Sequence, residues 1–234
     1  MSGGTVRITV TRQEPGGEPR EAVFDVPYDE RTSVLDALDW IKEHREPSLT
    51  YRWSCRSGVC GSCGVMVNGR PVLGCEATVS GYRTSGLAVG PLAEHEVQRD
   101  LAVDQDAFVA KLGTVSPWPV GGSTTPTPGA PGRQSPTDLA AYQQFSECIN
   151  CLLCYSACPV LADAPDFLGP AAVALARRWD LDSRDDGAAV RAEALVENEH
   201  GIWPCIQDGS CTRVCPKGVD PARALRDYQR EALG

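Results

Sequence analysis

Hydrophobic and polar residues alternate in the first part of the chain. Residues 5–11 place valine and isoleucine on one face and threonine and arginine on the other. Residues 22–26 alternate in the same way after residues 13–20, a stretch that carries two prolines and two glycines. Because alternation with a period of two is typical of a half-buried strand, the two segments predict a β-hairpin.

The pattern changes to helical spacing after this hairpin. Val34, Leu38 and Ile41 recur at i, i+4 and i+7, and either Thr32 or Ser33 precedes them as a hydroxyl cap. A second hairpin is indicated further on, where the dipeptide at 68–69, Asn-Gly, separates two apolar segments. Strands with one crossing helix predict a small α+β domain, which we place at residues 1–112.

Residues 113–137 contain six prolines and five glycines in 25 positions. This composition does not support a packed core and is typical of an extended tether. We therefore expect a linker over residues 113–137.

Helical signals dominate after the linker. A helix is expected from Asp138, a second one over 171–179 behind Pro170, and a third over 189–199. Asp220 and Pro221 predict the cap and first residue of a last helix. Residues 138–234 are thus predicted to form an all-α domain, short in apolar residues and rich in cysteine.

Charge and composition narrow the classes of function. The net charge of −9 argues against nucleic-acid binding, which needs basic patches, and leaves a protein partner or a small substrate. The longest apolar run of the second half, residues 171–176, is far shorter than the roughly 20 residues of a membrane helix. The first residues have no basic and apolar signal pattern, so we expect neither a secretory signal nor a transit peptide.

The chain contains eleven cysteines, an odd number that cannot be fully paired in disulfides within one chain. In a reducing compartment, clustered cysteines more often bind metal than form disulfides. The first group is Cys55, Cys60, Cys63 and Cys75. Its C-x4-C-x2-C spacing with a later fourth cysteine is the plant-type pattern for a [2Fe-2S] cluster.

Glycines between these cysteines suit a loop that wraps closely around a cluster with its amides pointing inward. A structural zinc site is the alternative interpretation of this group. Zinc sites favour two C-x2-C pairs or histidines, and neither occurs in this segment.

The second group has the spacing C-x2-C-x2-C-x3-C-P, and the third repeats it with Asp208 in place of one cysteine. In proteins with two cubane clusters, the fourth cysteine of such a run ligates the other cluster. The predicted ligands are Cys148, Cys151, Cys154 and Cys215 for a [4Fe-4S] cluster, and Cys158, Cys205 and Cys211 for a [3Fe-4S] cluster. Asp208 is either part of a solvated Asp-Gly turn or a carboxylate ligand to a fourth iron.

These motifs resemble the iron-sulfur subunit of succinate dehydrogenase and fumarate reductase. The resemblance covers nearly the whole chain and is carried by residues 54–64, 148–151, 182–185 and 214–217. The sequences of residues 144–151 and 167–172 resemble the fumarate reductase branch of this family more than the succinate dehydrogenase branch. The order of the three cysteine groups around a linker makes the resemblance very specific.

The resemblance implies a β-grasp [2Fe-2S] ferredoxin domain followed by a helical ferredoxin domain. It implies a flavoprotein partner with covalent FAD, where succinate and fumarate are interconverted, and membrane-anchor subunits that hold menaquinone or ubiquinone. Electrons would pass between FAD and quinone through the [2Fe-2S], [4Fe-4S] and [3Fe-4S] clusters, in the respiratory chain or the tricarboxylic acid cycle. The chain itself would hold no catalytic residue and would lie at the cytoplasmic face of the cell membrane.

The resemblance is weakest at the quinone end. Pro159 matches a residue that borders the quinone pocket in relatives, and Ile206 is a second candidate for the pocket wall. Many relatives carry a tryptophan and a lysine where this chain has Asp163 and Gln229. The kind of quinone and its pocket therefore stay open.

Two other classes of function are considered. One is the soluble electron-transfer subunit of another flavin oxidoreductase, whose relatives usually lack the plant-type domain. The other is a zinc-binding or redox-sensing protein without electron transfer. His44, His95 and His200 have no ligand spacing to one another or to the cysteines, so we expect them at the surface.

Overall fold

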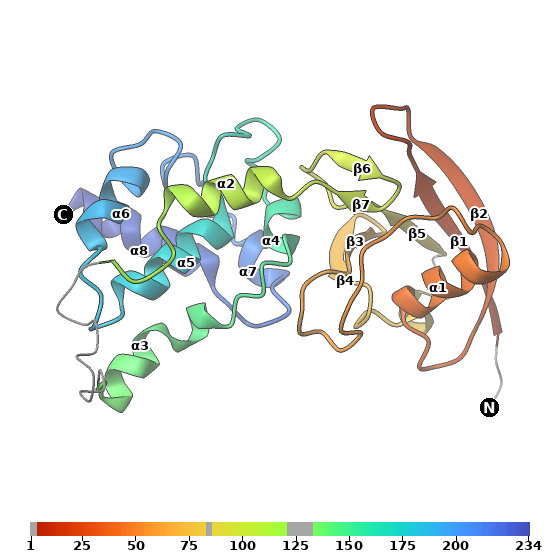
Figure 1. Ribbon diagram of the computed structural model, residues 1–234, viewed down its shortest axis with the longest axis horizontal. Helices are drawn as coiled ribbons and strands as arrows, with labels where there is room; N and C mark the ends of the chain where they lie inside the picture. Colours follow the sequence, from red (N-terminus) through yellow and green to blue (C-terminus); the bar gives the residue numbers. More distant parts are fainter. Residues whose placement is uncertain (1–3, 83–85, 121–132) are drawn as a thin grey trace. The chain divides into compact units, whose positions relative to one another are not determined.

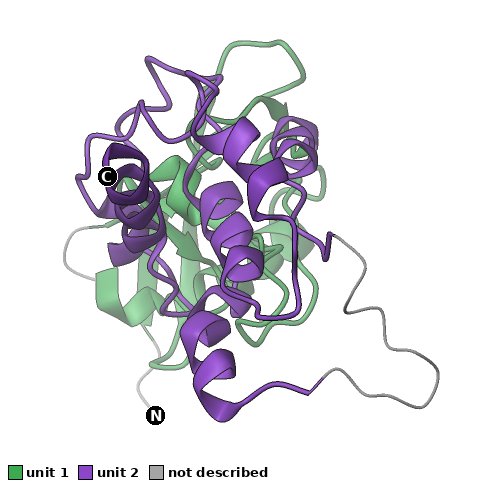
Figure 2. Cartoon of the chain, turned by 90° about the vertical axis from the view of Figure 1, so that its left-hand side faces the viewer, with its two compact units in different colours: residues 1–105, 149–157 green, residues 106–148, 158–234 purple. Residues whose placement is uncertain are grey.

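The computed structural model describes residues 4–82, 86–120 and 133–234 (Figure 1). The chain forms two compact units, shown in different colours in Figure 2. Unit 1 combines Met1–Gln105 with Ile149–Ala157, and unit 2 combines Asp106–Cys148 with Cys158–Gly234. A short piece of the second half of the sequence therefore packs in the first unit.

Unit 1 is built on a five-stranded sheet with the strand order β2-β1-β5-β3-β4. Its strands are β1 (Gly4–Arg12), β2 (Arg20–Tyr28), β3 (Gly64–Val67), β4 (Arg70–Leu73) and β5 (Leu87–Gly90). β1 and β2 pair antiparallel, as do β3 and β4, which confirms both predicted hairpins. β5 joins the hairpins, because it runs parallel to β1 and antiparallel to β3.

Helix α1 (Val34–His44) packs its apolar side into the core of unit 1. Val34, Leu38 and Ile41 are buried together with the inward-facing residues of β1, as their spacing predicted. Ser33 is the cap and forms a capping box with Asp36. The second hydroxyl that could have capped the helix, Thr32, instead bonds within the preceding turn.

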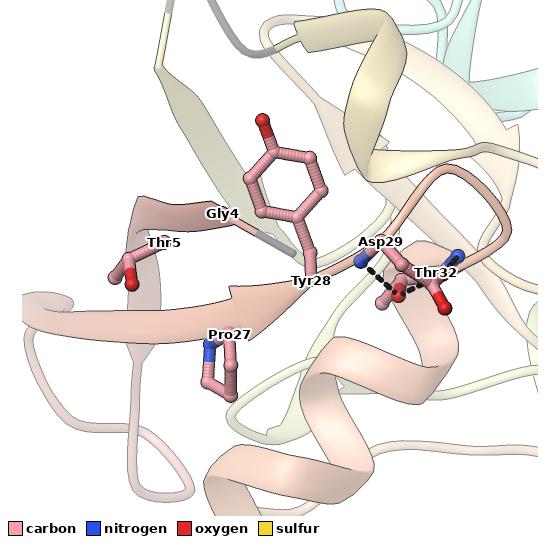
Figure 3. A pocket seen from close by; sticks show the side chains of 6 residues that line it. All are labelled: Gly4, Thr5, Pro27, Tyr28, Asp29 and Thr32. Atoms are coloured by element: carbon pink, nitrogen blue, oxygen red, sulfur yellow. Dashed lines mark hydrogen bonds between the residues drawn. The ribbon is translucent and has the colours of Figure 1, made fainter. Parts of the chain in front are cut away.

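That turn connects β2 to α1 and borders a hollow at the end of the first hairpin (Figure 3). The Thr32 hydroxyl accepts from the Asp29 amide at 2.9 Å, and the Thr32 amide donates to the Asp29 carboxylate at 3.0 Å. The hollow is lined by Gly4, Thr5, Pro27, Tyr28, Asp29 and Thr32. No cysteine belongs to this lining, so the hollow has no part in the predicted chemistry.

A buried ion pair fixes the end of β1. The Arg12 guanidinium donates to the Asp100 carboxylate at 2.8 Å, and both side chains are almost wholly buried. The same carboxylate accepts from the amides of Gln13 and Thr50. Asp100 lies between the short strands β6 (Val97–Arg99) and β7 (Ala102–Val103). The sequence patterns predict neither of these strands, nor the 3-10 turn η1 (Val79–Tyr82).

The helix α4 (Leu153–Ser156) belongs to unit 1 although it follows the linker in sequence. Its first residues, Leu153 and Cys154, are buried, and the Ser156 hydroxyl donates to the carbonyl of Ala93 at 2.9 Å. A Cβ atom on Gly64 would lie 2.9 Å from a Leu92 methyl group and 3.1 Å from the Cys151 carbonyl. Glycine thus allows this part of the chain to approach β3.

The described residues of unit 2 contain helices and no strand. The helices are α2 (Asp106–Thr114), α3 (Pro136–Ser146), α5 (Pro170–Asp180), α6 (Ala188–Leu195), α7 (Ser210–Arg213) and α8 (Pro221–Leu233). Pro170 opens α5 and Asp220 caps α8, as predicted. α3 begins two residues earlier than expected, because Ser135 is its cap and Asp138 completes the capping box.

The helix expected to continue to residue 199 ends at Leu195. The chain folds back there, and the amide of Ile202 donates to the Leu195 carbonyl at 2.9 Å. Gly201 permits this return, since a Cβ atom at that position would lie 2.1 Å from the Leu195 carbonyl oxygen. The sequence pattern missed the end because valine and glutamate, which fit a helix, follow directly after Leu195.

The domain boundaries expected from composition differ from the packing boundaries. α2 lies within unit 2, so the first boundary falls after Gln105 rather than after residue 112. The expected linker overlaps the end of α2 and the start of α3. Its central residues, 121–132, lie outside the described residues, and the linker over 113–137 remains a prediction.

Candidate iron-sulfur centres

The loop before β3 directs its backbone amides at cysteine sulfurs. The amides of Ser57, Val59 and Cys60 donate to the Cys55 sulfur at 3.4, 3.3 and 3.3 Å. The Cys55 amide donates to the Cys60 sulfur at 3.4 Å. Such amide donors stabilise negative charge on sulfur, so this loop has the character that an iron-sulfur cluster requires.

The fourth cysteine of the set lies just beyond β4. The Gly58 amide donates to the Cys75 sulfur at 3.3 Å, and the sulfurs of Cys75 and Cys63 are 3.3 Å apart. Cys63 directly precedes β3, and its carbonyl accepts from the Gly74 amide at 2.8 Å. The two ends of the β3–β4 hairpin therefore hold Cys63 and Cys75 side by side, with Cys75 within hydrogen-bond reach of the loop amide of Gly58.

Glycine is required in this loop at two positions. Gly58 and Gly61 have φ of +69° and +75°, which L side chains rarely adopt. A Cβ atom on Gly58 would lie 2.2 Å from a Glu76 carboxylate oxygen, and one on Gly61 would lie 2.5 Å from the Ile149 carbonyl. Both glycines therefore allow the loop to lie close to neighbouring chain.

The thiols of this set have unequal acidity. Hydrogen bonds from the amides of Ser57 and Val59 lower the pKa of the exposed Cys55 to about 6. Burial raises the pKa of Cys63 to about 12. Iron binds the thiolate form of cysteine, and of these two thiols Cys55 is the one more readily deprotonated.

The four cysteines predicted for the second centre are divided between the units. Cys151 and Cys154 lie in unit 1, and Cys148 and Cys215 lie in unit 2, so each pair is described within its own unit. Around Cys151, Asn150 and Leu152 have φ of +54° and +67°. These left-handed residues turn the chain sharply between the cysteines, a conformation that a compact ligand loop needs.

Cys148 and Cys215 follow the ends of helices in unit 2. Cys148 comes after the C-cap of α3, Glu147. The Cys215 amide donates to the Thr212 carbonyl at 3.2 Å in the turn that ends α7. Both cysteines are partly exposed.

The three cysteines predicted for the third centre lie together in unit 2. One hollow is lined by Cys158, Pro159, Val160, Phe167, Pro170, Cys205, Ile206, Gln207, Asp208, Gly209, Ser210, Cys211 and Leu225. Burial raises the pKa of Cys211 to about 11, and the charges of Cys205 and Cys158 add to the effect. The three thiols are thus close enough to influence one another, and no fourth cysteine lines the hollow.

Asp208 lines the same hollow, but its carboxylate is already engaged. It accepts from the Arg213 guanidinium at 2.8 Å and from the Ser210 hydroxyl at 2.8 and 3.1 Å. The hydrogen bond from Arg213 is the main cause that lowers the pKa of Asp208. The sequence motifs did not identify Arg213 as a partner of Asp208. The only signal for this pair in the sequence is an arginine five residues after the aspartate.

The candidates for the quinone pocket, Pro159 and Ile206, both border this hollow, and Ile206 is 68% exposed. Gln229, which replaces the expected lysine, donates to the Ile202 carbonyl at 2.9 Å and accepts from the Gln207 amide group at 2.7 Å. Asp163 lies in a turn, where its amide donates to the Val160 carbonyl. Gln229 therefore ties α8 to the loop that carries Cys205.

The histidines contribute no candidate ligand. His44 and His200 are exposed, whereas His95 is partly buried and lies 6.2 Å from the Tyr155 ring, centroid to centroid. Among the residues that the structure describes, no group of three or more His, Cys, Asp or Glu side chains is placed to hold a single metal ion. No helix within the described ranges has both the length and the apolar character to span a membrane.

Comparisons with known proteins match both halves of the chain. The family described as "2Fe-2S iron-sulfur cluster binding domain" matches residues 7–110, and the family described as "4Fe-4S dicluster domain" matches residues 144–219. The first match covers the four cysteines of the first centre, and the second covers the other seven.

Curated proteins and a solved structure are similar over nearly the full length. The fumarate reductase iron-sulfur subunit of Mycobacterium tuberculosis is 47% identical, over 97% of this chain and 92% of that protein. The corresponding Escherichia coli subunit (strain O6:H1) is 45% identical, over 97% and 93%. The succinate dehydrogenase iron-sulfur subunit of Paracoccus denitrificans is 36% identical, over 94% and 85%.

The solved structure is titled "Mycobacterium smegmatis Sdh1 complex in the apo form". One of its chains superposes with a TM-score of 0.84 at 27% sequence identity, and the match covers 99% of this chain and 97% of that chain. The similarity therefore extends over both units.

Proposed function

The chain belongs to the family of fumarate reductase and succinate dehydrogenase iron-sulfur subunits, and we propose that it relays electrons between the FAD of a flavoprotein subunit and quinone at a membrane anchor. The observation that carries this proposal is the set of backbone amides aimed at the sulfurs of Cys55, Cys60 and Cys75. Amide donors to sulfur favour a cluster over a bare thiol.

The proposal assigns one cluster to each group of cysteines. The ligands are Cys55, Cys60, Cys63 and Cys75 for [2Fe-2S]; Cys148, Cys151, Cys154 and Cys215 for [4Fe-4S]; and Cys158, Cys205 and Cys211 for [3Fe-4S]. The first set is supported by the backbone amides that donate to Cys55. The third set is supported by the burial of Cys211 and its proximity to Cys205 and Cys158. For the second set, the support is the spacing of the cysteines and the left-handed turns beside Cys151.

In fold terms, unit 1 would be a β-grasp ferredoxin domain and unit 2 a helical ferredoxin domain. A mixed five-stranded sheet with one packed helix supports the first assignment. The helices of unit 2 support the helical ferredoxin assignment. The proposed domains are residues 1–112 and 138–234, and they differ from the two packed units at α2 and at the segment 149–157.

When bound, the clusters take up and release single electrons. The chain holds them and sets the charge around them. The amides that donate to Cys55 would stabilise negative charge on a cluster held there, which would favour its reduced state. Of the third set, Cys211 is buried, whereas Cys158 and Cys205 are partly exposed. In this proposal the cysteines act only as cluster ligands, and no catalytic role is assigned to a residue of this chain.

The partners follow from the proposed electron relay. A flavoprotein subunit would bind succinate or fumarate, and membrane-anchor subunits would bind menaquinone or ubiquinone at the cytoplasmic face of the membrane. Ile206 and Pro159, exposed beside the third set of cysteines, are the proposed quinone-facing residues.

The test is the reduction of the clusters by succinate. The full chain, purified anaerobically with its partner subunits, is mixed with succinate and followed by electron paramagnetic resonance. We expect cluster signals that change on adding succinate and return on adding fumarate. If dithionite reduces the clusters but succinate reduces none, the proposal is refuted in favour of another flavin oxidoreductase. Bound zinc without acid-labile sulfide would refute electron transfer altogether.

A further inference from the structure

A carboxylate occupies the place of the missing cysteine. Asp208 lies midway between Cys205 and Cys211, and all three line the hollow that also contains Cys158. Carboxylate oxygens bind ferrous iron in many protein sites. A fourth ligand for a fourth iron is therefore present in the sequence of the third set.

Two neighbouring side chains engage this carboxylate. Arg213 Nη2 donates to Asp208 Oδ2 at 2.8 Å and to the Ser210 hydroxyl at 2.6 Å. The Ser210 hydroxyl in turn contacts Asp208 Oδ2 at 2.8 Å and Oδ1 at 3.1 Å. We call Ser210 and Arg213 the Asp208 clamp. Both oxygens therefore already accept hydrogen bonds, and iron would compete with the Arg213 guanidinium for the negative charge of Asp208.

The backbone around Asp208 is held by the same guanidinium. Arg213 Nη1 donates to the Asp208 carbonyl at 2.9 Å. Gly209 has a φ of +78°, and a Cβ atom there would lie 3.4 Å from Arg213 Nη1, so glycine leaves room for the guanidinium. Gln207, on the other side, has a φ of +61°. The main chain and the side chain of Asp208 are thus fixed together.

We propose that the Asp208 clamp weakens the binding of the carboxylate to iron and so disfavours conversion of the third centre from three irons to four. This inference rests on the proposed [3Fe-4S] cluster at Cys158, Cys205 and Cys211. Release of the clamp makes the centre easier to convert to a four-iron cluster with Asp208 as the fourth ligand.

The conversion balances without electron transfer. The neutral, reduced three-iron cluster takes up one ferrous ion from solution and becomes a four-iron cluster with a charge of two plus. The ferrous ion forms bonds to three sulfides of the cluster and to one Asp208 oxygen, and it loses water ligands. The ion pair between Asp208 and Arg213 breaks. Dithionite supplies the electron that first reduces the three-iron cluster.

The experiment compares Arg213→Gln with the wild type and with Arg223→Gln. Arg223 is a matched control, since it is also an exposed arginine of unit 2 paired with an aspartate, Asp227, at 3.5 Å. The full chain in its complex is reduced with dithionite and titrated anaerobically with isotopically labelled ferrous iron. Mössbauer spectra then measure how much label has entered a cluster.

We expect Arg213→Gln to lower the ferrous iron concentration needed for half-conversion by about two- to fivefold, the range of one exposed ion pair. Arg223→Gln should behave like the wild type. Adding Asp208→Ala to Arg213→Gln should abolish uptake, which identifies the carboxylate as the ligand. A purely structural role of Arg213 would alter stability but not label uptake into the cluster.

Two results would overturn the inference, and they are distinguishable. If the oxidised wild type has the three-iron signal but Arg213→Gln takes up no more iron than Arg223→Gln, the clamp has no such role and the proposed function stands. If the oxidised wild type has no three-iron signal, the cluster assignment in the proposed function fails and the inference fails with it.

Discussion

Gly61 offers a quantitative test of how the first cysteine loop is packed. Gly61→Ala places a methyl group in a left-handed conformation, at a cost of roughly 1–2 kcal/mol. It also places that methyl 2.5 Å from the Ile149 carbonyl oxygen, and such overlap in a packed site costs roughly 1–3 kcal/mol more. The summed destabilisation is about 2–5 kcal/mol.

Gly69→Ala is the matched control. Gly69 has nearly the same φ, +76°, but nothing lies within 4 Å of a Cβ atom built there. The control therefore carries only the conformational cost. The difference between the two variants isolates the overlap with Ile149 and Cys151.

The assay is the thermal midpoint of the near-ultraviolet circular dichroism of the intact chain, scanned at one rate for all variants. For a chain of this size, each kcal/mol shifts the midpoint by roughly 2–4 °C. With an overlap of about 2 kcal/mol, Gly61→Ala should melt about 4–8 °C below Gly69→Ala. Equal midpoints for the two variants would refute the close approach of residue 149 to the loop.

Two further predictions concern charged groups. Arg191→Met should destabilise the chain by about 3–5 kcal/mol, measured by denaturant unfolding, because it leaves the buried carboxylates of Asp180 and Asp185, each 2.7 Å away, without their cation. Arg7→Met, which breaks an exposed pair, should change the same quantity by less than about 1 kcal/mol, and equal effects would contradict the argument. In the iron-free chain, alkylation of Cys55 should be half-maximal near pH 6, because its lowered pKa leaves the reactive thiolate dominant above that pH. A midpoint near the ordinary thiol value of about 8.5 would show that the amides do not hold this sulfur.

Local patterns predicted much of the secondary structure. Alternation and turn residues located both hairpins, and caps located the starts of α1, α5 and α8. β6 and β7 were missed because they are three and two residues long, too short to show a period. β5 was missed because its pairing depends on β1 and β3, which are distant in sequence.

For the candidate sites as well, the sequence predicted the local features and missed those that depend on tertiary structure. Cysteine spacing is a local property, so the sequence could propose the three ligand sets, and the third set does lie together. The ion pair between Arg213 and Asp208 depends on the loop conformation at Gly209, which spacing does not encode. Residues 149–157 pack in unit 1 through tertiary contacts, which composition does not encode. Composition therefore assigned this segment to the second domain.

That return affects the order in which the protein can fold during synthesis. Unit 1 needs residues 149–157 to cover Gly61 and Gly64, so its packing stays incomplete until the ribosome has passed residue 157. Contacts between such distant residues form late and slow folding. A chain truncated after residue 112 would lack this cover, and its cysteine loop would remain open on one side. The packing around the first cysteine loop is therefore completed only after much of the second half of the chain has been translated.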